Sequence, residues 1–511
     1  MMKPNFLIYL SLTVFSFSNV FAQEKAVKPN VLFIAVDDLK PYLNFYGYAA
    51  VKSPNLDKLA QNSTVFMSNY CQQAVCAPTR ASLLTGLRPD RTQVWDLKTL
   101  IRDKVPNVVT LPQFFKQHGY TTAALGKIFD QRSVDKKHDD LSWSEPYKKK
   151  YKYPEQYGEP LLGHYQNAET KKKYAGKDES EMLEAKVSTE SADVPDDAYV
   201  DGAMVKEAIA DLKKYGTSGK PFFLAVGIRK PHLPFVAPKK YWDMYNRDKI
   251  ELASWQKPSI DGPQIAYHTS GELRGYTDIK ALSKENEPLN LSSDKQKELI
   301  HGYYATISYV DALIGNLLAE LNSSGLAKNT IVVFWGDHGW HFGDHNLWNK
   351  HSNFEQATRT PLMISLPNQQ SKIVYNSVTE FVDVYPTLAE LAGLPVANNL
   401  DGKSLVSALK GDQNVIKEFA ISQYPRNRGE ENYMGYALRT KQYRLVEWIK
   451  DFRTTQKFDP VKVHAIELYD YDKDPLETKN LANDPAYQKI KEDLSKKMHA
   501  FYAEQEVKAK K

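Results

Sequence analysis

The sequence predicts an α/β fold: a doubly wound central sheet flanked by helices, followed by a smaller α+β subdomain with an antiparallel sheet. Three observations predict it. Short apolar runs alternate with helical patterns through most of the chain, polar residues directly follow several of those runs, and the pattern becomes β-rich after about residue 419. Because ligands of doubly wound sheets gather at the carboxyl ends of strands, the polar positions there form the candidate site.

The first predicted strand is PNVLFIAVDDL, residues 29–39, an apolar run that ends in two aspartates. Such a run is typical of a buried parallel strand. A helix follows over 53–63, where Ser53 and Pro54 form a start signal. The patterns then continue as a helix and a strand over 109–129, a helix over 204–216, a strand over 221–228, a helix over 307–325 and a strand over 329–337.

The C-terminal part has a different texture. Short β-rich segments occupy 434–448 and 464–475, and a charged helical pattern over 493–506 closes the chain. A length of 511 residues is too great for one average domain, and an apolar fraction of 42% allows a sizeable core. We therefore predict a signal peptide over 1–22, an N-terminal domain that carries the site over 23–418, and a C-terminal α+β subdomain over 419–511.

The N-terminus predicts export. Lys3 precedes an apolar run, and small residues allow cleavage near Ala22. A membrane anchor is the alternative, but the run contains Ser and Asn and is shorter than the roughly 20 residues that a span needs. No later stretch is apolar enough to cross a bilayer. We expect a secreted or periplasmic mature protein.

A net charge of +5 is nearly balanced for this length, but residues 147–177 mix lysine with tyrosine. This segment is either a solvated surface loop or a cationic, aromatic rim that attracts an anionic partner. Nucleic acid is not the expected partner, because no recognised nucleic-acid motif accompanies the patch. Residues 252–290 are also polar and predict a long loop of the kind that binds or covers ligands.

Acidic residues follow two of the predicted strands. Asp37 and Asp38 end the first strand, and Asp337 with His338 ends the last. Each acid alone is more often a cap or a surface residue. Adjacent carboxylates, however, are hard to bury together unless a cation neutralises them. Together these residues favour a hard divalent cation, Ca²⁺ or Mg²⁺, over zinc.

The chain has two cysteines, Cys71 and Cys76, and a disulfide between them is physically possible. The segment CAPTRASLLTG, from residue 76, resembles the signature of the sulfatase family, Cys-x-Pro-x-Arg followed by Thr-Gly. In that family an enzyme oxidises the cysteine to Cα-formylglycine (3-oxoalanine). The resemblance implies this modification at Cys76, a formylglycine-generating or radical maturase as partner, and a buried thiol at Cys71. Thr79 stands where a serine is frequent, but the core pattern is intact, so we expect modification.

Further segments resemble formylglycine-dependent sulfatases of the iduronate-2-sulfatase group and its bacterial relatives. They include NVLFIAVDDL, SPNLDKLA, LTGLRPD, GKIF, KPHLPF, GDHGW, LWNKHSNFEQATRTPL and HAIELYDYDKDP, in order from Asn30 to Pro475. The resemblance implies an alkaline-phosphatase-like fold with a C-terminal sulfatase subdomain. It also implies hydrolysis of O-sulfate esters on a sulfated carbohydrate, with uronate 2-O-sulfate or algal and glycosaminoglycan-type saccharides as candidates.

The resemblance also implies the site residues. The Ca²⁺ ligands fall on Asp37, Asp38, Asp337 and His338, with the formylglycine made from Cys76 as a further ligand. Arg80 would hold the formylglycine hydrate. Lys127 and Lys350 would bind the sulfate oxygens and neutralise their charge. His232 would contact the substrate and protonate the leaving oxygen. Asp337 would act as base while one hydroxyl of the hydrate attacks sulfur, and loss of the second proton would release sulfate.

One position departs from the family pattern. The family has a histidine shortly after the lysine of the GK segment, where this chain has Asp130. The family assigns that histidine to deprotonating the second hydroxyl. Asp130 could serve as a carboxylate base, His138 could reach in from the following loop, or turnover could be slow.

Two other functions stay open at this point. A phosphoester or phosphonate hydrolase can share this fold and sometimes uses formylglycine. A non-catalytic protein that binds sulfated glycans would instead keep Cys76 unmodified.

Overall fold

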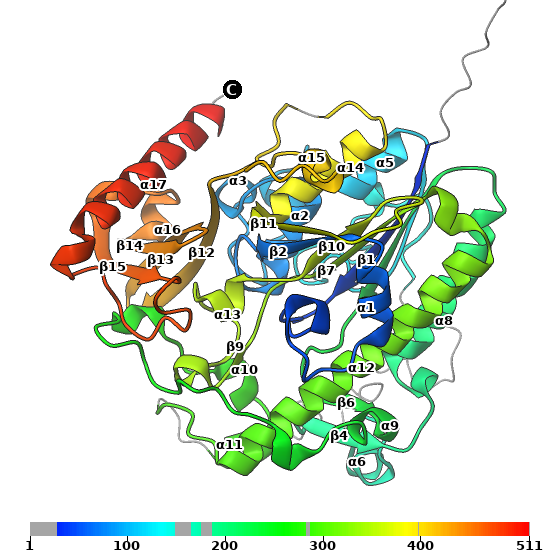
Figure 1. Cartoon of the computed structure of the whole chain (residues 1–511), viewed down its shortest axis with the longest axis horizontal. Coiled ribbons are helices and arrows are strands. Elements are labelled where there is room, and N and C mark those ends of the chain that lie inside the picture. The colour runs from blue at the N-terminus through cyan, green and yellow to red at the C-terminus, as the bar shows by residue number, and fades with distance from the viewer. Residues whose placement is uncertain (1–27, 149–164, 175–185, 283–286, 397, 510–511) are drawn as a thin grey trace, which may run out of the picture.

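A seven-stranded sheet forms the centre of the structure (Figure 1), a computed structural model that describes residues 28–148, 165–174, 186–282, 287–396 and 398–509. In spatial order its strands are β11 (Ile373–Glu380), β2 (Thr64–Tyr70), β10 (Leu362–Ser365), β7 (Thr330–Gly336), β1 (Asn30–Val36), β5 (Phe222–Ile228) and β3 (Thr121–Gly126). Neighbouring strands pair in parallel, except that β10 runs antiparallel to both β2 and β7. The predicted doubly wound sheet is confirmed, with one reversed strand that the sequence analysis did not predict.

Helices cover both faces of this sheet (Figure 1). One face packs against α1 (Pro54–Ala60), α8 (Val200–Gly216) and α12 (Ser293–Ser323), and the other against α2 (Cys76–Thr85), α5 (Leu111–Gln117) and α14 (Val384–Leu391). Alternate residues of β1 enter the two cores, so Ile34 belongs to the first and Phe33 to the second. Because successive side chains of a strand point to opposite faces, a strand covered on both sides has a continuous apolar run.

The register of the central strands aligns their carboxyl ends. Val36, the last residue of β1, pairs with Ile228 at the end of β5 and with Gly336 at the end of β7. β3 ends at Gly126, which pairs with Gly227 of β5. The segments that follow these four strands therefore start at one edge of the sheet, as a doubly wound fold requires.

A second sheet lies beside the first and forms the C-terminal part (Figure 1). It is antiparallel, in the order β12 (Phe419–Arg428), β13 (Glu431–Thr440), β14 (Tyr443–Lys450) and β15 (Val463–Asp470), and α17 (Gln488–Ala509) packs against it. The predicted antiparallel sheet and closing helix are confirmed. The boundary at residue 419 stays a prediction, although β12 begins there.

Shorter α-helices and strands complete the described part of the chain. They are α3 (Pro89–Thr92), α4 (Ile101–Lys104), α6 (Ala168–Tyr174), β4 (Thr189–Ala192), β6 (Phe235–Pro238), α9 (Lys239–Trp242), α10 (Gly271–Arg274), α11 (Thr277–Lys280), β8 (His341–Phe342), β9 (Trp348–Asn349), α13 (Glu355–Thr358), α15 (Val406–Leu409) and α16 (Phe452–Thr455). Residues 252–290 are therefore not a plain loop as predicted, because α10 and α11 form within them.

Two predictions fall partly or wholly outside the described residues. The signal peptide predicted over 1–22 lies wholly outside them. The basic, tyrosine-rich segment over 147–177 lies partly outside them, at 149–164 and 175–177. Among the helices that the structure describes, none combines the length and apolar character that a membrane crossing requires.

Candidate active site

The two acids that follow β1 are buried and are held by cations. Asp37 accepts hydrogen bonds from Arg80 Nη2 at 3.1 Å and from Lys127 Nζ at 2.6 Å. Burial alone would raise the pKa of Asp37, but the charges of Lys127 and Arg80 hold it well below its usual value. Asp38 accepts hydrogen bonds from Lys350 Nζ at 2.9 and 3.0 Å. The two adjacent carboxylates are thus surrounded by the positive charges of Arg80, Lys127 and Lys350.

Arg80 joins this cluster to the end of β7. It lies one turn into α2 and is fully buried, and its Nε donates to Asp337 Oδ2 at 2.9 Å. Its Nη1 donates to the carbonyl oxygens of Lys127 and Ile128. One guanidinium therefore contacts the segments that follow three different strands, which is the geometry that its planar fork of donors suits.

Cys76 is the first residue of α2 and is buried beside the acids. Its Sγ lies 3.4 Å from His338 Nε2 and 3.9 Å from Asp38 Oδ1. Both cysteines are free, so the alternative of a disulfide is wrong for this structure, and the predicted buried thiol at Cys71 is confirmed. Burial, together with the charge of Asp37, raises the pKa of Cys76 well above its usual value.

The donor groups fit one metal ion. Asp38, Cys76, Asp337 and His338 each offer a ligand atom, and these atoms all lie within 4.8 Å of one another. Ligands at 2.3–2.6 Å from a Ca²⁺ ion are separated by up to roughly 5 Å, so the spacing suits a single ion. A sulfur ligand favours zinc, whereas an oxygen at residue 76 would favour Ca²⁺. Asp37, Asp38, Cys76 and His232 form a second such group, whose ligand atoms also lie within 4.8 Å of one another.

Lys127 enters the site because β3 ends in a glycine. Gly126 has a φ of 72°, and a Cβ there would lie 1.9 Å from the carbonyl oxygen of Gly227. Only glycine permits this close approach and left-handed turn. Lys127 then contacts Asp37, and its Nζ lies 3.5 Å from Asp130 Oδ2. Although burial would lower the pKa of Lys127, Asp37 raises it, so the ammonium stays charged.

His232 and Lys350 lie on another side of the acids. His232 Nε2 is 3.8 Å from Asp38 Oδ2, and its Nδ1 is 2.7 Å from the carbonyl oxygen of Leu233. Lys350 contacts Asp38 as described. Burial would lower the pKa of Lys350, but the negative charges of Asp38 and Glu272 raise it well above the usual value. The structure thus brings all the predicted site residues together, but their catalytic roles stay predictions.

Glu272 is a site residue that the sequence analysis missed. It lies in α10, and its carboxylate is 3.0 Å from His232 Nε2 and 2.9 Å from Lys350 Nζ. Within the sequence, GELR is an unremarkable part of a polar segment. Its only signal was the polar segment over 252–290, which predicted a loop that binds or covers ligands.

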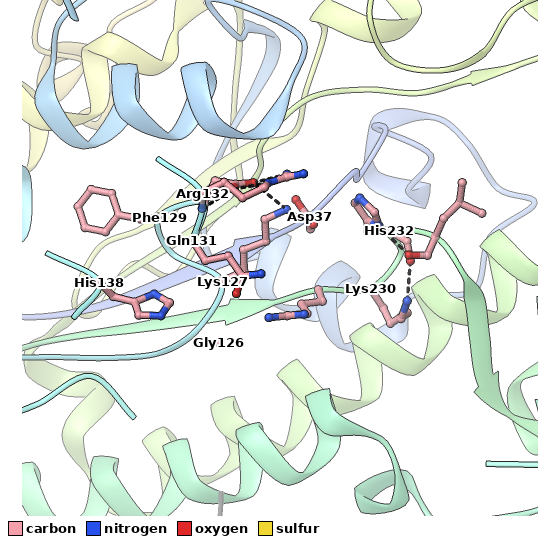
Figure 2. A pocket seen from close by; sticks show the side chains of 12 residues that line it. Asp37, Gly126, Lys127, Phe129, Gln131, Arg132, His138, Lys230 and His232 are labelled. Carbon is pink, nitrogen blue, oxygen red and sulfur yellow. Dashed lines mark hydrogen bonds and ion pairs between the residues drawn. The ribbon is translucent and has the colours of Figure 1, made fainter. Parts of the chain in front are cut away.

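A cavity of about 190 Å³ opens beside Lys127 (Figure 2). Its charged lining consists of Asp37, Lys127, Asp130, Arg132, His138, Arg229, Lys230 and His232. In the view of Figure 2, His138 and His232 lie on opposite sides of Lys127. The four lysine and arginine side chains outnumber the two carboxylates, so the cavity favours an anionic ligand. Arg132 was also missed, because nothing in its local sequence marks it.

Asp130 is engaged by cations in this cavity. It accepts hydrogen bonds from Arg132 Nε and Nη2, both at 2.8 Å. Burial would raise the pKa of Asp130, but Lys127 and Arg132 together hold it far below its usual value. Such a carboxylate is a weak base.

Two family models match most of the chain. A family model described as sulfatase matches residues 29–394, and one described as N-sulphoglucosamine sulphohydrolase, C-terminal, matches residues 343–504. The chain is 35% identical over 519 residues to iduronate 2-sulfatase of Mus musculus, with 89% of this chain and 91% of that protein covered.

Solved structures with the same fold include a phosphonate monoester hydrolase from Silicibacter pomeroyi, with a TM-score of 0.70 and 22% identity over 93% of this chain and 95% of that one. Another is a protein in complex with its substrate D-glucosamine-2-N,6-O-disulfate, with a TM-score of 0.68 and 19% identity over 94% and 98% of the two chains. At these identities the likeness concerns the fold, and the expected alkaline-phosphatase-like architecture is confirmed.

Proposed function

Because this chain belongs to the sulfatase family, a family of sulfuric ester hydrolases, we propose that it is an exported enzyme that removes sulfate from a sulfated carbohydrate. One observation carries the proposal. Cys76 lies in a buried cluster with metal-ligating groups, two lysines and a histidine, all placed at the carboxyl edge of the sheet. The lysines suit the negative charge of a sulfate ester, the carboxylates suit a metal ion, and the histidine suits proton transfer.

The state of Cys76 argues for its conversion. A nucleophilic cysteine must be a thiolate, and burial beside Asp37 keeps this thiol protonated. Converted to formylglycine, residue 76 supplies a hydrated aldehyde whose hydroxyl attacks sulfur and whose second hydroxyl allows sulfate to leave. A separate maturase must carry out the conversion.

The proposed metal ligands are Asp37, Asp38, Asp337, His338 and the oxygen of formylglycine 76. A Ca²⁺ ion held there would lower the pKa of the hydrate and screen the developing negative charge. Lys127 and Arg80 hold the pKa of Asp37 well below its usual value, and Lys350 donates to Asp38. The candidate ligand atoms of Asp38, Cys76, Asp337 and His338 already lie within 4.8 Å of one another, as binding of one ion requires.

The remaining residues bind the sulfate and move protons. Lys127 and Lys350 stay charged and neutralise the sulfate oxygens. His232 donates a proton to the leaving sugar oxygen. Burial raises the pKa of Asp337, although the charges of His338 and Arg80 oppose the change. A raised pKa makes Asp337 a stronger base than Asp37, whose pKa is lowered.

We propose an acidic saccharide as substrate. The cavity beside Lys127 is lined by Arg132, Arg229 and Lys230, which would attract a carboxylate or a further sulfate on the sugar. Among the described residues, the Arg229 guanidinium has no hydrogen-bonded or ion-paired side chain. Uronate 2-O-sulfate is the leading candidate, in line with the name of the mouse relative.

A phosphonate or phosphate ester hydrolase is the second candidate, because one fold neighbour carries that name. The deciding experiment measures sulfate release from a panel of defined sulfated oligosaccharides, beside phosphate release from matched esters. Sulfate release that exceeds phosphate release supports the proposal, and the reverse order supports the second candidate. A protein with neither activity and an unmodified Cys76 would instead be a glycan-binding protein.

A further inference from the structure

The Glu272 carboxylate connects two of the proposed catalytic residues, His232 and Lys350. Its Oε1 lies 3.0 Å from both His232 Nε2 and Lys350 Nζ. Its Oε2 lies 2.9 Å from Lys350 Nζ and 3.2 Å from His351 Nε2. Burial would raise the pKa of Glu272, but the charge of Lys350 and the hydrogen bond from His232 hold it well below its usual value. The side chain is therefore an anion surrounded by donors.

We propose that Glu272 is a positioning residue: its carboxylate holds the His232 ring in the orientation that protonation of the leaving oxygen requires, and it fixes Lys350 beside that ring. The inference rests on the proposed function. It adds to that function a residue of α10, in the polar segment before α12 and outside the motifs quoted for the family resemblance.

Both His232 and Lys350 need a hydrogen-bond partner that fixes their side chains. Lysine has a long flexible stem, and fixing it costs side-chain entropy unless several hydrogen bonds hold its ammonium group. Lys350 is held between Asp38 and Glu272, so its position is set before substrate arrives. The Nδ1 of His232 faces the Leu233 carbonyl oxygen at 2.7 Å, and its Nε2 faces Glu272 Oε1 at 3.0 Å. The proton on Nε2 is therefore the one offered to the leaving oxygen, which would take the place of Glu272 Oε1 beside this nitrogen. Fixing both nitrogens fixes the orientation of the ring.

Glu272 is itself anchored to the C-terminal sheet. His351, which contacts Glu272 Oε2, has its Nδ1 2.7 Å from the hydroxyl of Tyr424 in β12. The chain of contacts therefore runs from β12 through His351 and Glu272 to His232. A carboxylate supported in this way orients its partners more strictly than one on a free loop.

The experiment compares Glu272→Gln with the wild-type enzyme on two substrates. An aryl sulfate such as 4-nitrophenyl sulfate has an acidic leaving group that needs little protonation, whereas a sugar sulfate releases an alcohol that needs a proton. We expect kcat on the sugar sulfate to fall about 100-fold and kcat on the aryl sulfate to fall less than about 10-fold. Glu251→Gln, which changes an exposed acid upstream in the same loop region, should leave both values unchanged.

Equal losses of kcat on both substrates, or no loss on the sugar sulfate, would overturn the inference. Tyr424→Phe provides a second route if Glu272→Gln does not fold, because it removes only the hydroxyl that contacts His351. It should show the same selective loss at roughly 3- to 10-fold, and an unselective effect would also count against the inference. A wild-type enzyme that releases no sulfate from either substrate would contradict the proposed function instead.

Discussion

Arg80 Nε lies 2.9 Å from Asp337 Oδ2, across 257 residues of sequence. This bond joins the first turn of α2 to the end of β7, and the same guanidinium also contacts Asp37 after β1. All three side chains are buried. Arg80 therefore links the ends of β1 and β7 and neutralises part of the negative charge of Asp37 and Asp337.

Replacing Arg80 with Met should destabilise the protein strongly. Removing one partner of a buried pair leaves uncompensated carboxylates and costs about 3–5 kcal/mol. A clear fall in the thermal unfolding temperature should accompany loss of activity. Lys137→Met is the matched control, since its pair with Asp140 has side chains that are 74% and 53% exposed. Equal unfolding temperatures for the two variants would contradict the assignment.

Cys76 should be found as formylglycine in protein made together with a maturase. Peptide mass spectrometry of the segment that contains Cys76 measures the conversion directly. Cys76→Ala should lose at least about 10³-fold in kcat, because residue 76 is the proposed nucleophile. Wild-type protein that is fully active with an intact thiol would refute this mechanism.

Removing calcium should inhibit the matured enzyme reversibly. Treatment with a chelator should abolish sulfate release, and added Ca²⁺ should restore it. A Ca²⁺ concentration about 100-fold above Kd should also raise the free energy of unfolding by about 2.7 kcal/mol. Cys76 that remains a thiol should shift the preference toward zinc, because sulfur is a softer ligand than oxygen. Calcium binding of equal strength to both forms would argue against residue 76 as a ligand.

Asp130→Asn should slow sulfate release by roughly 10-fold if the carboxylate takes the second proton. The ion pair with Arg132 makes Asp130 a weak base, so His138→Asn must be measured beside it. Product-release kinetics after the first turnover would report the step. Unchanged turnover in Asp130→Asn would remove Asp130 from the mechanism, and a loss confined to His138→Asn would transfer the role.

Asp311 should make stability depend on pH. From α12 it accepts hydrogen bonds from the backbone amides of Asn55 and Leu56, at the start of α1, yet burial raises its pKa to about 6. The folded state therefore binds a proton that the unfolded state, with a pKa of 3.8, does not. The contribution of Asp311 to the free energy of unfolding is fully present below a pH of about 3.8 and is lost as the pH rises through about 6.

The measurement for Asp311 is urea unfolding of the wild type and Asp311→Asn at pH 5 and pH 7.5. The deficit of the variant should be larger at pH 5, by roughly 1–3 kcal/mol. A deficit that does not change with pH would show that Asp311 titrates normally in the folded protein.

Much of the site was predictable because its residues follow strands. Apolar runs such as 30–36 predict buried strands, and the chain continues directly from them into Asp37 and Asp38. In a parallel sheet the register then brings strand ends together, so Asp337 was expected nearby. Cys76 and Lys127 were assigned through resemblance to a family, since neither has a distinctive local pattern.

The sequence by itself determined which strands are buried and which polar residues leave them, because apolar periodicity is a local property of the chain. Only the tertiary structure decided that β10 runs antiparallel, that Glu272 reaches His232 and Lys350, and that Arg132 holds Asp130. These contacts join segments whose local patterns are ordinary. Their partners are set by how distant parts of the chain pack, which no short window of sequence records.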